Sequence, residues 1–302
     1  MCADRGPAPA ALLTTSGVAL PDPVLHDKLD ALRHEMARIG PVVVAFSGGA
    51  DSALVARVAT DVLGPTRALC VTAVSPSLAP EELDDCRALA AEWGLRWSHV
   101  VTTELDSDDY AANGTDRCYH CKTSLLAALD PVAAAESATV VLGVNLDDLG
   151  DHRPGQRAAA ERGAVFPLVA AGLTKADVRA LSRHLGLRTW DKPAAACLAS
   201  RVPYGTPVTL GTLGAVAAAE SALRRLGFRQ LRVRHYGDLA RIELEPGDLA
   251  AALARRSDVV AAVQEAGYRY VTLDLEGFRS GNLNHAVPAG DAVGPAGGGR
   301  TT

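Results

Sequence analysis

A short glycine-containing segment between a predicted strand and a predicted helix constrains the fold of this chain most. Residues 47–52 read Ser-Gly-Gly-Ala-Asp-Ser. The apolar run of residues 41–46 before the segment predicts a buried strand, and the apolar spacing of residues 51–63 predicts a helix. A strand that ends in glycines where a helix begins is typical of α/β folds that bind phosphate at the helix N-terminus.

The residue types of this segment favour phosphate binding over an ordinary strand-to-helix turn. Gly48 and Gly49 allow the backbone to approach an anion and to adopt positive φ, so that successive N–H groups point into one concavity. Ser47 and Ser52 add hydroxyl donors, and the helix dipole adds positive potential. Asp51 is repelled by phosphate unless it helps to hold a divalent cation. The sequence matches neither the Walker A pattern nor the GxGxxG pattern.

Strands and helices alternate along the first two thirds of the chain. Apolar runs predict further strands at residues 68–74, 95–101 and 139–144, and helices are predicted at residues 80–93 and 124–135. Continuous apolar strands separated by helices predict a parallel sheet that is covered on both faces. We therefore expect a doubly wound α/β domain.

A different pattern begins after Thr209. A long Ala-rich helix is predicted at residues 213–226, and strands are predicted at residues 230–235, 241–244 and 269–274, with one helix between the last two. This order predicts a smaller α+β domain. The expected division is a disordered tail, the α/β domain, a linker that carries Cys197, the α+β domain and a second disordered tail, at residues 1–20, 21–192, 193–209, 210–285 and 286–302.

The overall composition argues against several classes of protein. The 302 residues carry 30 basic and 35 acidic side chains, a net charge of −5, so we expect no nucleic acid partner. The apolar runs are too short for a membrane span, and the N-terminus does not resemble a secretory signal. The six cysteines are interpreted as thiols of a cytoplasmic protein rather than as a disulfide framework.

Three of the cysteines have informative surroundings. Cys118 and Cys121 form a CxxC pair, and Cys197 lies among small residues between Lys192 and Arg201. Cationic neighbours favour a reactive thiolate at Cys197, and a buried structural cysteine is the alternative. The CxxC pair fits a redox disulfide or half of a zinc site, but the chain has no second CxxC. Three thiols suit an iron–sulfur cubane that leaves one iron open to another ligand.

Motifs along nearly the whole chain resemble those of one enzyme family. The loop at residues 47–52 matches the phosphate loop of the PP-loop ATP pyrophosphatases. The wider set resembles the LarE family, the ATP-dependent sulfur transferases of nickel-pincer nucleotide cofactor biosynthesis. The matching segments are SGGADS at 47–52, VSPSL at 74–78, RCYHCK at 117–122, GVNLDD at 143–148, DHRPG at 151–155, GLTK at 172–175, WDKP at 190–193, CLASRVPYG at 197–205 and LRVRHYGDLARIE at 231–243.

The resemblance implies a two-step reaction. The enzyme would cleave ATP between the α and β phosphates, adenylate a carboxylate of pyridinium-3,5-biscarboxylic acid mononucleotide, and replace AMP with sulfur to give a thiocarboxylate. In one branch of the family a single cysteine at the place of Cys197 gives up its sulfur and becomes dehydroalanine. In the other branch three cysteines hold a [4Fe-4S] cluster that carries an extra sulfide. Because this chain has Cys118, Cys121 and Cys197, we favour the cluster branch, with a sulfide or persulfide donor.

The resemblance and the chemistry of the side chains together assign the remaining site residues. Nucleotide binding is assigned to Ser47, Gly48, Gly49, Asp51, Ser52, Val74, Ser75 and Gly143. Mg²⁺ is assigned to Asp51 with Asp147, Asp148 or Asp151. Binding of the substrate's phosphate and carboxylates is assigned to Lys122, Ser200, Arg201, Arg232 and Arg234, with Glu220, Glu243 and Arg279 lining the same pocket. Because Arg232 and Arg234 alternate along one predicted strand, both are expected on the same face.

Two other functions are compatible with the loop. A PP-loop enzyme that thiolates tRNA also carries three cysteines in some cases, but it needs a basic surface, which the net charge of −5 does not indicate. An inactive nucleotide-binding module would retain the glycines without needing the cysteines. The resemblance also implies a homo-oligomer, as a hexamer, although no segment of the sequence signals an oligomer.

Overall fold

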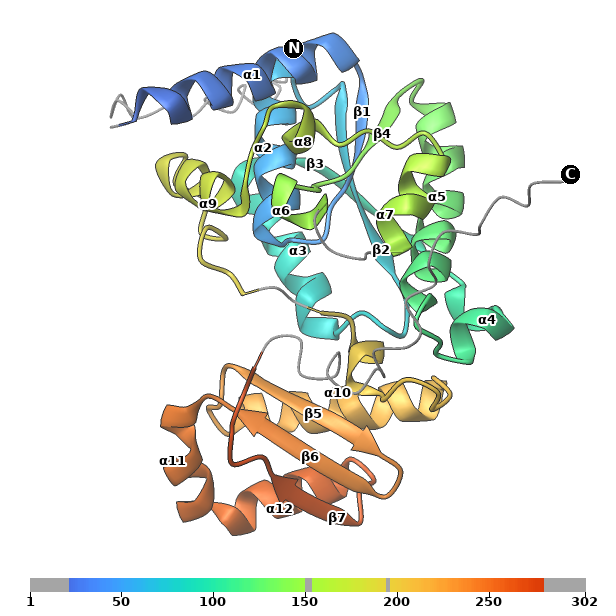
Figure 1. Cartoon of the computed structure of the whole chain (residues 1–302), viewed down its shortest axis with the longest axis vertical. Coiled ribbons are helices and arrows are strands. Elements are labelled where there is room, and N and C mark those ends of the chain that lie inside the picture. The colour runs from blue at the N-terminus through green and yellow to red at the C-terminus, as the bar shows by residue number, and fades with distance from the viewer. Residues whose placement is uncertain (1–21, 150–153, 194–195, 280–302) are drawn as a thin grey trace, which may run out of the picture.

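The structure is a computed structural model that describes residues 22–149, 154–193 and 196–279. The described residues form a four-stranded parallel sheet with helices on both faces and, later in the chain, a three-stranded sheet (Figure 1). The predicted α/β class is confirmed. The tails predicted at residues 1–20 and 286–302, and Asp151, lie outside the described residues.

The four strands of the first sheet stand in the order β3-β2-β1-β4, and all neighbours are parallel. They are β1 (Val42–Ala45), β2 (Ala68–Val74), β3 (Arg96–Val101) and β4 (Thr139–Val141). The prediction that β4 continues to Val144 is wrong, because the Leu142 amide donates to the Val165 carbonyl at 3.0 Å instead of continuing along β1. The chain thus leaves the sheet just before Gly143.

The helices cover both faces of this sheet (Figure 1). On one face lie α1 (Pro23–Ile39), α2 (Ala50–Leu63), α3 (Pro80–Trp93) and α9 (Lys175–His184), and on the other lie α5 (Arg117–Ala135) and α7 (Pro154–Glu161). Short helical segments connect them: η1 (Glu104–Asp106), α4 (Asp108–Ala111), α6 (Leu146–Leu149) and α8 (Pro167–Ala170).

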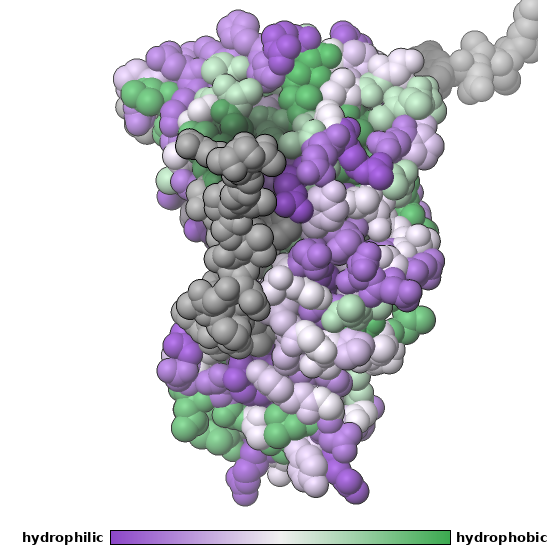
Figure 2. Space-filling view, turned by 45° about the vertical axis from the view of Figure 1, so that its right-hand side comes forward, coloured by the Kyte–Doolittle hydropathy of each residue, from purple (hydrophilic) through white to green (hydrophobic). Residues whose placement is uncertain are grey.

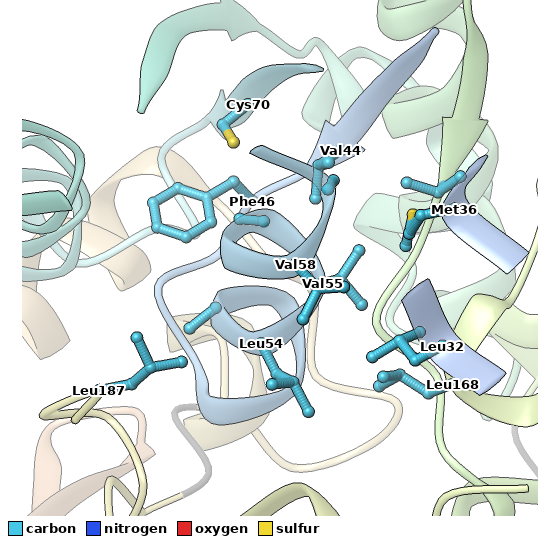
Figure 3. Packing of buried hydrophobic residues seen from close by; sticks show 14 of the residues in the cluster. Leu32, Met36, Val44, Phe46, Leu54, Val55, Val58, Cys70, Leu168 and Leu187 are labelled. Carbon is cyan, nitrogen blue, oxygen red and sulfur yellow. The ribbon is translucent and has the colours of Figure 1, made fainter. Parts of the chain in front are cut away.

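Alternation along β1 explains how one strand supplies two cores. Val44 and Phe46 pack on the α2 face with Leu54 and Cys70 (Figure 3), whereas Val43 packs on the opposite face. Successive side chains of a strand point to opposite faces, so a continuous apolar run is needed when both faces are covered. The prediction of a buried strand from the apolar run of residues 41–46 is therefore confirmed.

Helix α5 is longer than the sequence pattern indicates. The apolar spacing predicts a helix from Ser124, but the observed helix begins at Arg117 and so contains Cys118 and Cys121. The first two turns pack through Gly155 of α7, where an added Cβ would lie 2.9 Å from the Cys118 carbonyl oxygen. Backbone contact of this kind leaves no apolar periodicity in the sequence.

The C-terminal sheet stands in the order β5-β6-β7, with β5 and β6 antiparallel and β6 and β7 parallel. Its elements are α10 (Leu210–Arg225), β5 (Leu231–Tyr236), β6 (Leu239–Leu244), η3 (Pro246–Asp248), α11 (Leu249–Ala254), α12 (Arg256–Glu265) and β7 (Tyr270–Leu273). The single helix expected between β6 and β7 is thus two consecutive helices, and α10 and α12 pack with the sheet in one apolar core.

The predicted linker contributes to a core of its own. Within it, the 3-10 turn η2 (Leu198–Arg201) directly follows Cys197. Leu198 and Ala199 are buried with Tyr110 and with Val216 of α10. The described part of the segment is therefore packed between the two sheet regions, next to the N-terminal part of α10 (Figure 1). The domain boundaries themselves stay a prediction.

The surface of the described residues is mixed in polarity. On the face seen in Figure 2, apolar side chains form small patches among hydrophilic ones. Within the described ranges, none of the helices has both the length and the apolar composition needed to span a membrane.

Candidate active site

A pocket of about 200 Å³ lies at the carboxyl ends of three parallel strands. Its walls come from the last residues of β1 and β2, from the segment after β4, and from Lys122 and Leu125 of α5. Because the chain adds β2 and β3 on one side of β1 and β4 on the other, the pocket lies where the strand order reverses. Open α/β sheets bind ligands at such switch points.

The phosphate loop forms one wall of this pocket. Gly48 has φ of +65°, and Gly49 precedes α2 with an extended φ of −80°. Only Gly48 therefore needs the left-handed conformation, whereas Gly49 lines the pocket, where a side chain would take up ligand space. The hydroxyl oxygens of Ser47 and Ser52 lie 3.1 Å apart, and both residues line the pocket.

The segment after β4 packs directly on this loop. A Cβ added to Gly143 would lie 2.6 Å from the Ser52 amide nitrogen, so the two backbones are in close contact. Gly143 also lines the pocket. Val74 and Ser75 were also predicted to bind nucleotide. Val74 is the last residue of β2 and Ser75 follows it, but neither residue lines the pocket.

Asp51 is held by two side chains from distant parts of the chain. Its carboxylate accepts a hydrogen bond from Asn145 Nδ2 at 3.1 Å and forms an ion pair with the ammonium group of Lys175. Lys175 is the first residue of α9, and its backbone amide donates to Asp147 at 2.7 Å. Asp148 caps the Asn145 amide at 3.1 Å. Four acidic residues were assigned to Mg²⁺, and of the three that the structure describes, Asp51 alone lines the pocket.

Of the three cysteines, Cys121 directly precedes Lys122, which lines the pocket. Cys118 and Cys197 are exposed and Cys121 is partly buried against the apolar cluster around η2. Burial raises the pKa of the Cys121 thiol to about 12, and interaction with Cys197 and Cys118 contributes in the same direction. Cys121 therefore lies within electrostatic range of each of the other two thiols.

The three thiols do not form a site for a single metal ion. Among the described residues, no group of three or more His, Cys, Asp or Glu side chains is arranged to hold one. A cluster distributes its thiolates over different iron atoms, so its ligands need not converge on one point. Three soft thiol donors from two neighbouring segments fit the chemistry of such a cluster.

Two buried ion pairs lie near the cysteine segment: one joins it to helix α10, and the other joins strands β5 and β6 of the C-terminal sheet. Arg201 donates to both carboxylate oxygens of Glu220 at 2.8 and 3.1 Å. Arg234 donates to both oxygens of Glu243 at 3.0 and 2.9 Å. Both glutamates are 0% exposed. These four residues were predicted to contact substrate, and the structure gives each of them a partner within the protein.

Arg232 differs from its two arginine neighbours. It lies on β5 with Arg234, is 7% exposed, and stacks its guanidinium 4.6 Å from the centre of the Phe278 ring. Burial, with the positive charges of Arg201 and Arg234, lowers the pKa of Arg232 to about 10. An anion beside Arg232 would relieve this crowding of positive charge. Arg279 is exposed and forms an ion pair with Glu276.

Several residues near the site were given no role by the sequence analysis. Lys175 and Asn145 hold Asp51 from 124 and 94 residues away, a separation that leaves no local signal. Glu104 is 3% exposed and interacts electrostatically with Cys121; among the described residues its Oε2 has no hydrogen-bond partner. Arg117, Asn145 and Lys175 each lie within a motif that matches the family, and this membership is the signal in the sequence that marks them.

Comparisons with known proteins agree with this geometry. The family model for NAD synthase matches residues 24–116, which contain β1, the phosphate loop and β2. The fold and the loop thus define an α/β enzyme of the PP-loop class. The chain is 47% identical over 267 residues to an uncharacterized protein of Synechocystis, covering 87% of this chain and 99% of the relative.

A second relative identifies the family. Pyridinium-3,5-bisthiocarboxylic acid mononucleotide synthase of Lactiplantibacillus plantarum is 44% identical over 250 residues, which cover 82% of this chain and 90% of that protein. An uncharacterized protein of Methanocaldococcus jannaschii is 27% identical over 240 residues, 79% of this chain and 91% of the relative. The chain belongs to the family of this synthase, the LarE family of ATP-dependent sulfurtransferases.

Proposed function

We propose that this enzyme converts a carboxylate of pyridinium-3,5-biscarboxylic acid mononucleotide into a thiocarboxylate at the expense of ATP. A carboxylate oxygen attacks the α-phosphorus, the bond to the β-phosphate oxygen breaks, and pyrophosphate leaves. A sulfur nucleophile then attacks the acyl carbon, and the carbon–oxygen bond to AMP breaks. Adenylation makes an otherwise poor leaving group a good one.

The pocket at the switch point supports the first step. Backbone amides of the phosphate loop, with the hydroxyls of Ser47 and Ser52, would hold the phosphates at the N-terminus of α2. Asp51 lines the pocket, and its carboxylate would hold Mg²⁺ there to neutralise charge on the departing pyrophosphate. Lys175, now paired with Asp51, is a cation in reach of the same site.

Lys122 and Arg232 are the two cations that we propose bind the substrate. Lys122 lines the nucleotide pocket and is adjacent in the chain to Cys121. The guanidinium of Arg232 is buried. It stacks on the Phe278 ring and lies near the positive charges of Arg201 and Arg234. Both Lys122 and Arg232 suit the phosphate and carboxylates of a mononucleotide. Ser200, Arg201, Arg234, Glu220, Glu243 and Arg279 stay predicted members of the substrate pocket.

The second step requires a sulfur donor beside the activated carboxylate. Cys118, Cys121 and Cys197 would hold a [4Fe-4S] cluster, and such a cluster supplies an open iron able to carry an additional sulfide. The alternative uses the same segment without iron: the Cys197 thiolate attacks the acyl adenylate, and its Cβ–S bond then breaks to leave dehydroalanine at position 197. The exposed position of Cys197 is compatible with both routes.

One observation carries the proposal. Cys121 packs against the apolar cluster that contains Leu198 and Ala199, which directly follow Cys197, while the residue after Cys121 lines the pocket that the phosphate loop forms. Helix α5 thereby carries both the CxxC pair and a residue of the pocket, and its first turns pack against the segment that follows Cys197. A chain that only bound nucleotide would not need this arrangement.

Anaerobic purification followed by turnover tests the proposal and separates its two routes. Iron and acid-labile sulfide are measured first, and the intact protein mass is measured after reaction with ATP and the biscarboxylic mononucleotide. The cluster route predicts iron, labile sulfide and an unchanged polypeptide mass. The sacrificial route predicts loss of one sulfur and two hydrogen atoms at Cys197. A protein that hydrolyses ATP but never yields a thiocarboxylate would contradict both.

Cysteine variants sharpen this comparison. Cys197→Ser removes the sulfur that both routes need, so thiocarboxylate formation is expected to stop in either case. Cys118→Ser abolishes iron binding and sulfur transfer in the cluster route but leaves the sacrificial route active. Cys70→Ser is the matched control, because Cys70 is a buried core thiol in β2 away from the other three.

A further inference from the structure

The carbonyl groups around Cys197 are held by buried arginines. Arg201 Nη1 donates to the carbonyl oxygens of Ala196 at 2.7 Å and of Cys197 at 3.2 Å. Arg234 Nη1 donates to the carbonyl oxygen of Ser200 at 2.9 Å. Both arginines also bind a buried glutamate of the C-terminal region. The cysteine turn is thus fixed from the side of α10 and β5.

A third arginine holds the same turn from the cysteine-bearing helix. Arg117 Nη1 donates to the carbonyl oxygen of Ala199 at 2.9 Å, across 82 residues of sequence. Arg117 is the first residue of α5, immediately before Cys118, and it is 4% exposed. One hydrogen-bonded side chain therefore connects the start of the CxxC helix to the turn that follows Cys197.

Asn113 anchors this connection. Its Oδ1 accepts a hydrogen bond from Arg117, and its Nδ2 donates to the carbonyl oxygens of Pro203 and Thr206, both at 2.8 Å. Asn113 is 0% exposed and has a left-handed φ of +59°. Asparagine tolerates that conformation better than most residues do. The side chain thus ties the segment after Cys197 to the entrance of α5 a second time.

Among the residues that the structure describes, the partners of Arg117 are electrically neutral. Besides the Ala199 carbonyl and Asn113, its guanidinium lies 5.7 Å from the centre of the Tyr204 ring. Burying a guanidinium without a carboxylate is costly, and an apolar side chain would fill the same space at lower cost. An apolar residue, however, could not donate a hydrogen bond from the start of α5 to the turn that follows Cys197. The position therefore uses arginine to fix geometry.

We propose that Arg117, anchored by Asn113, is a positioning residue that holds the Cys197 turn in register with Cys118 and Cys121. Its effect on the spacing of the thiols follows from the hydrogen bonds alone. Its effect on sulfur transfer rests on the proposed function, since transfer requires the sulfur to be held within reach of the activated carboxylate.

Thiol cross-linking in the full chain, after removal of metal with a chelator, tests the spacing directly. Dibromobimane joins two neighbouring thiols and fluoresces when both ends have reacted, and peptide mass spectrometry identifies the pair. The variants are Arg117→Met, which removes the donors, and Arg117→Lys, which retains a donor. The control is Arg96→Met, which breaks an exposed pair with Glu136 elsewhere in the protein.

We expect Arg117→Met to lower the yield of cross-links between Cys197 and the CxxC pair by about tenfold, because a fixed approach of two groups is replaced by a mobile one. Arg117→Lys should recover part of the yield, and Arg96→Met should match the wild type. Equal yields in the wild type and Arg117→Met would overturn the proposal. So would an equal loss in Arg117→Met and Arg96→Met, which would indicate general destabilisation.

Two further measurements keep the proposal testable if Arg117→Met does not fold. Asn113→Gly preserves the left-handed backbone but removes the anchor, and it should lower the same cross-link yield. In assays of folded variants, pyrophosphate release should keep the wild-type KM for the mononucleotide, while the rate of thiocarboxylate formation falls by about 10- to 100-fold. A raised KM with an unchanged transfer rate would assign Arg117 to substrate binding instead. If the wild-type enzyme transferred no sulfur, the proposed function would fail, but the cross-link yields would still test whether Arg117 sets the spacing of the thiols.

Discussion

Gly143, which follows β4, and Ser52, in the first turn of α2, are in backbone contact: a Cβ on Gly143 would lie 2.6 Å from the Ser52 amide nitrogen. Gly143→Ala must therefore push the first turn of α2 away from the pocket. We expect the free energy of unfolding to fall by about 1–3 kcal/mol, as for overpacked sites, and ATP binding to weaken. Urea denaturation and calorimetric titration measure the two effects.

Gly214→Ala is the control for this substitution. Gly214 is exposed within α10, and an added Cβ has no neighbour within 4 Å. Alanine in a helix interior should raise the free energy of unfolding by about 0.5–1 kcal/mol relative to glycine. If Gly143→Ala were as stable as Gly214→Ala, the close backbone contact between Gly143 and Ser52 would be contradicted.

Lys175→Met removes the cation that is paired with Asp51. A charge-assisted hydrogen bond contributes about 1.5–3 kcal/mol, so affinity for ATP with Mg²⁺ should fall by about 10- to 100-fold if Lys175 turns to the phosphates. Lys28→Met is the matched control, because Lys28 forms a 2.5 Å pair with Asp177 away from the residues that line the pocket. Unchanged ATP affinity in Lys175→Met would remove this lysine from the site.

The thiols should differ in their reactivity with pH. The pKa of Cys121 is raised to about 12, first by burial, so its thiolate fraction at pH 8 is about one in ten thousand. In metal-free protein, iodoacetamide at pH 8 should modify the exposed Cys118 well before Cys121, and Cys121 should gain reactivity as the pH rises. Peptide mapping over time follows each thiol. Equal rates at pH 8 would contradict the burial of Cys121.

The same shift of the Cys121 pKa predicts a slope of stability with pH. Because the folded pKa lies above that of a free thiol, the folded protein retains a proton that the unfolded chain loses. The free energy of unfolding should therefore fall as the pH rises from about 9 towards 12. Cys121→Ala should reduce that slope in urea denaturation at several pH values.

Glu220→Gln leaves the Arg201 guanidinium buried without its bidentate carboxylate. Breaking a buried ion pair from one side costs about 3–5 kcal/mol, so a large fall in the midpoint of urea denaturation is expected. The exposed pair of Arg96 with Glu136 provides the comparison, and Glu136→Gln should have little effect. Equal effects of the two substitutions would show that Glu220 is not buried as described.

Much of the α/β region was predictable because its signals are local. The apolar run before Ser47 marks a strand that is covered on both faces, and the glycines mark the turn into α2. The position of Arg232 and Arg234 on one strand also follows from the period of two residues. In each case the relevant residues lie within a few positions of one another.

What the sequence could not predict depends on contacts between distant segments. The pairing of Asp51 with Lys175 and the hydrogen bond from Arg117 to Ala199 each join residues more than 80 positions apart. The first turns of α5 were missed because they pack on the Gly155 backbone rather than through an apolar stripe. The prediction that Arg201 faces substrate did not anticipate its bond to Glu220, because charge alone does not identify a partner.

The most direct test of the account is the product of a single turnover. The enzyme, purified anaerobically and supplied with ATP, Mg²⁺ and pyridinium-3,5-biscarboxylic acid mononucleotide, is quenched, and the small molecules are identified by mass spectrometry. We predict AMP, pyrophosphate and a mononucleotide in which one carboxylate oxygen has been replaced by sulfur. ADP and phosphate in place of AMP and pyrophosphate, or AMP with a mononucleotide that never gains sulfur, would contradict it.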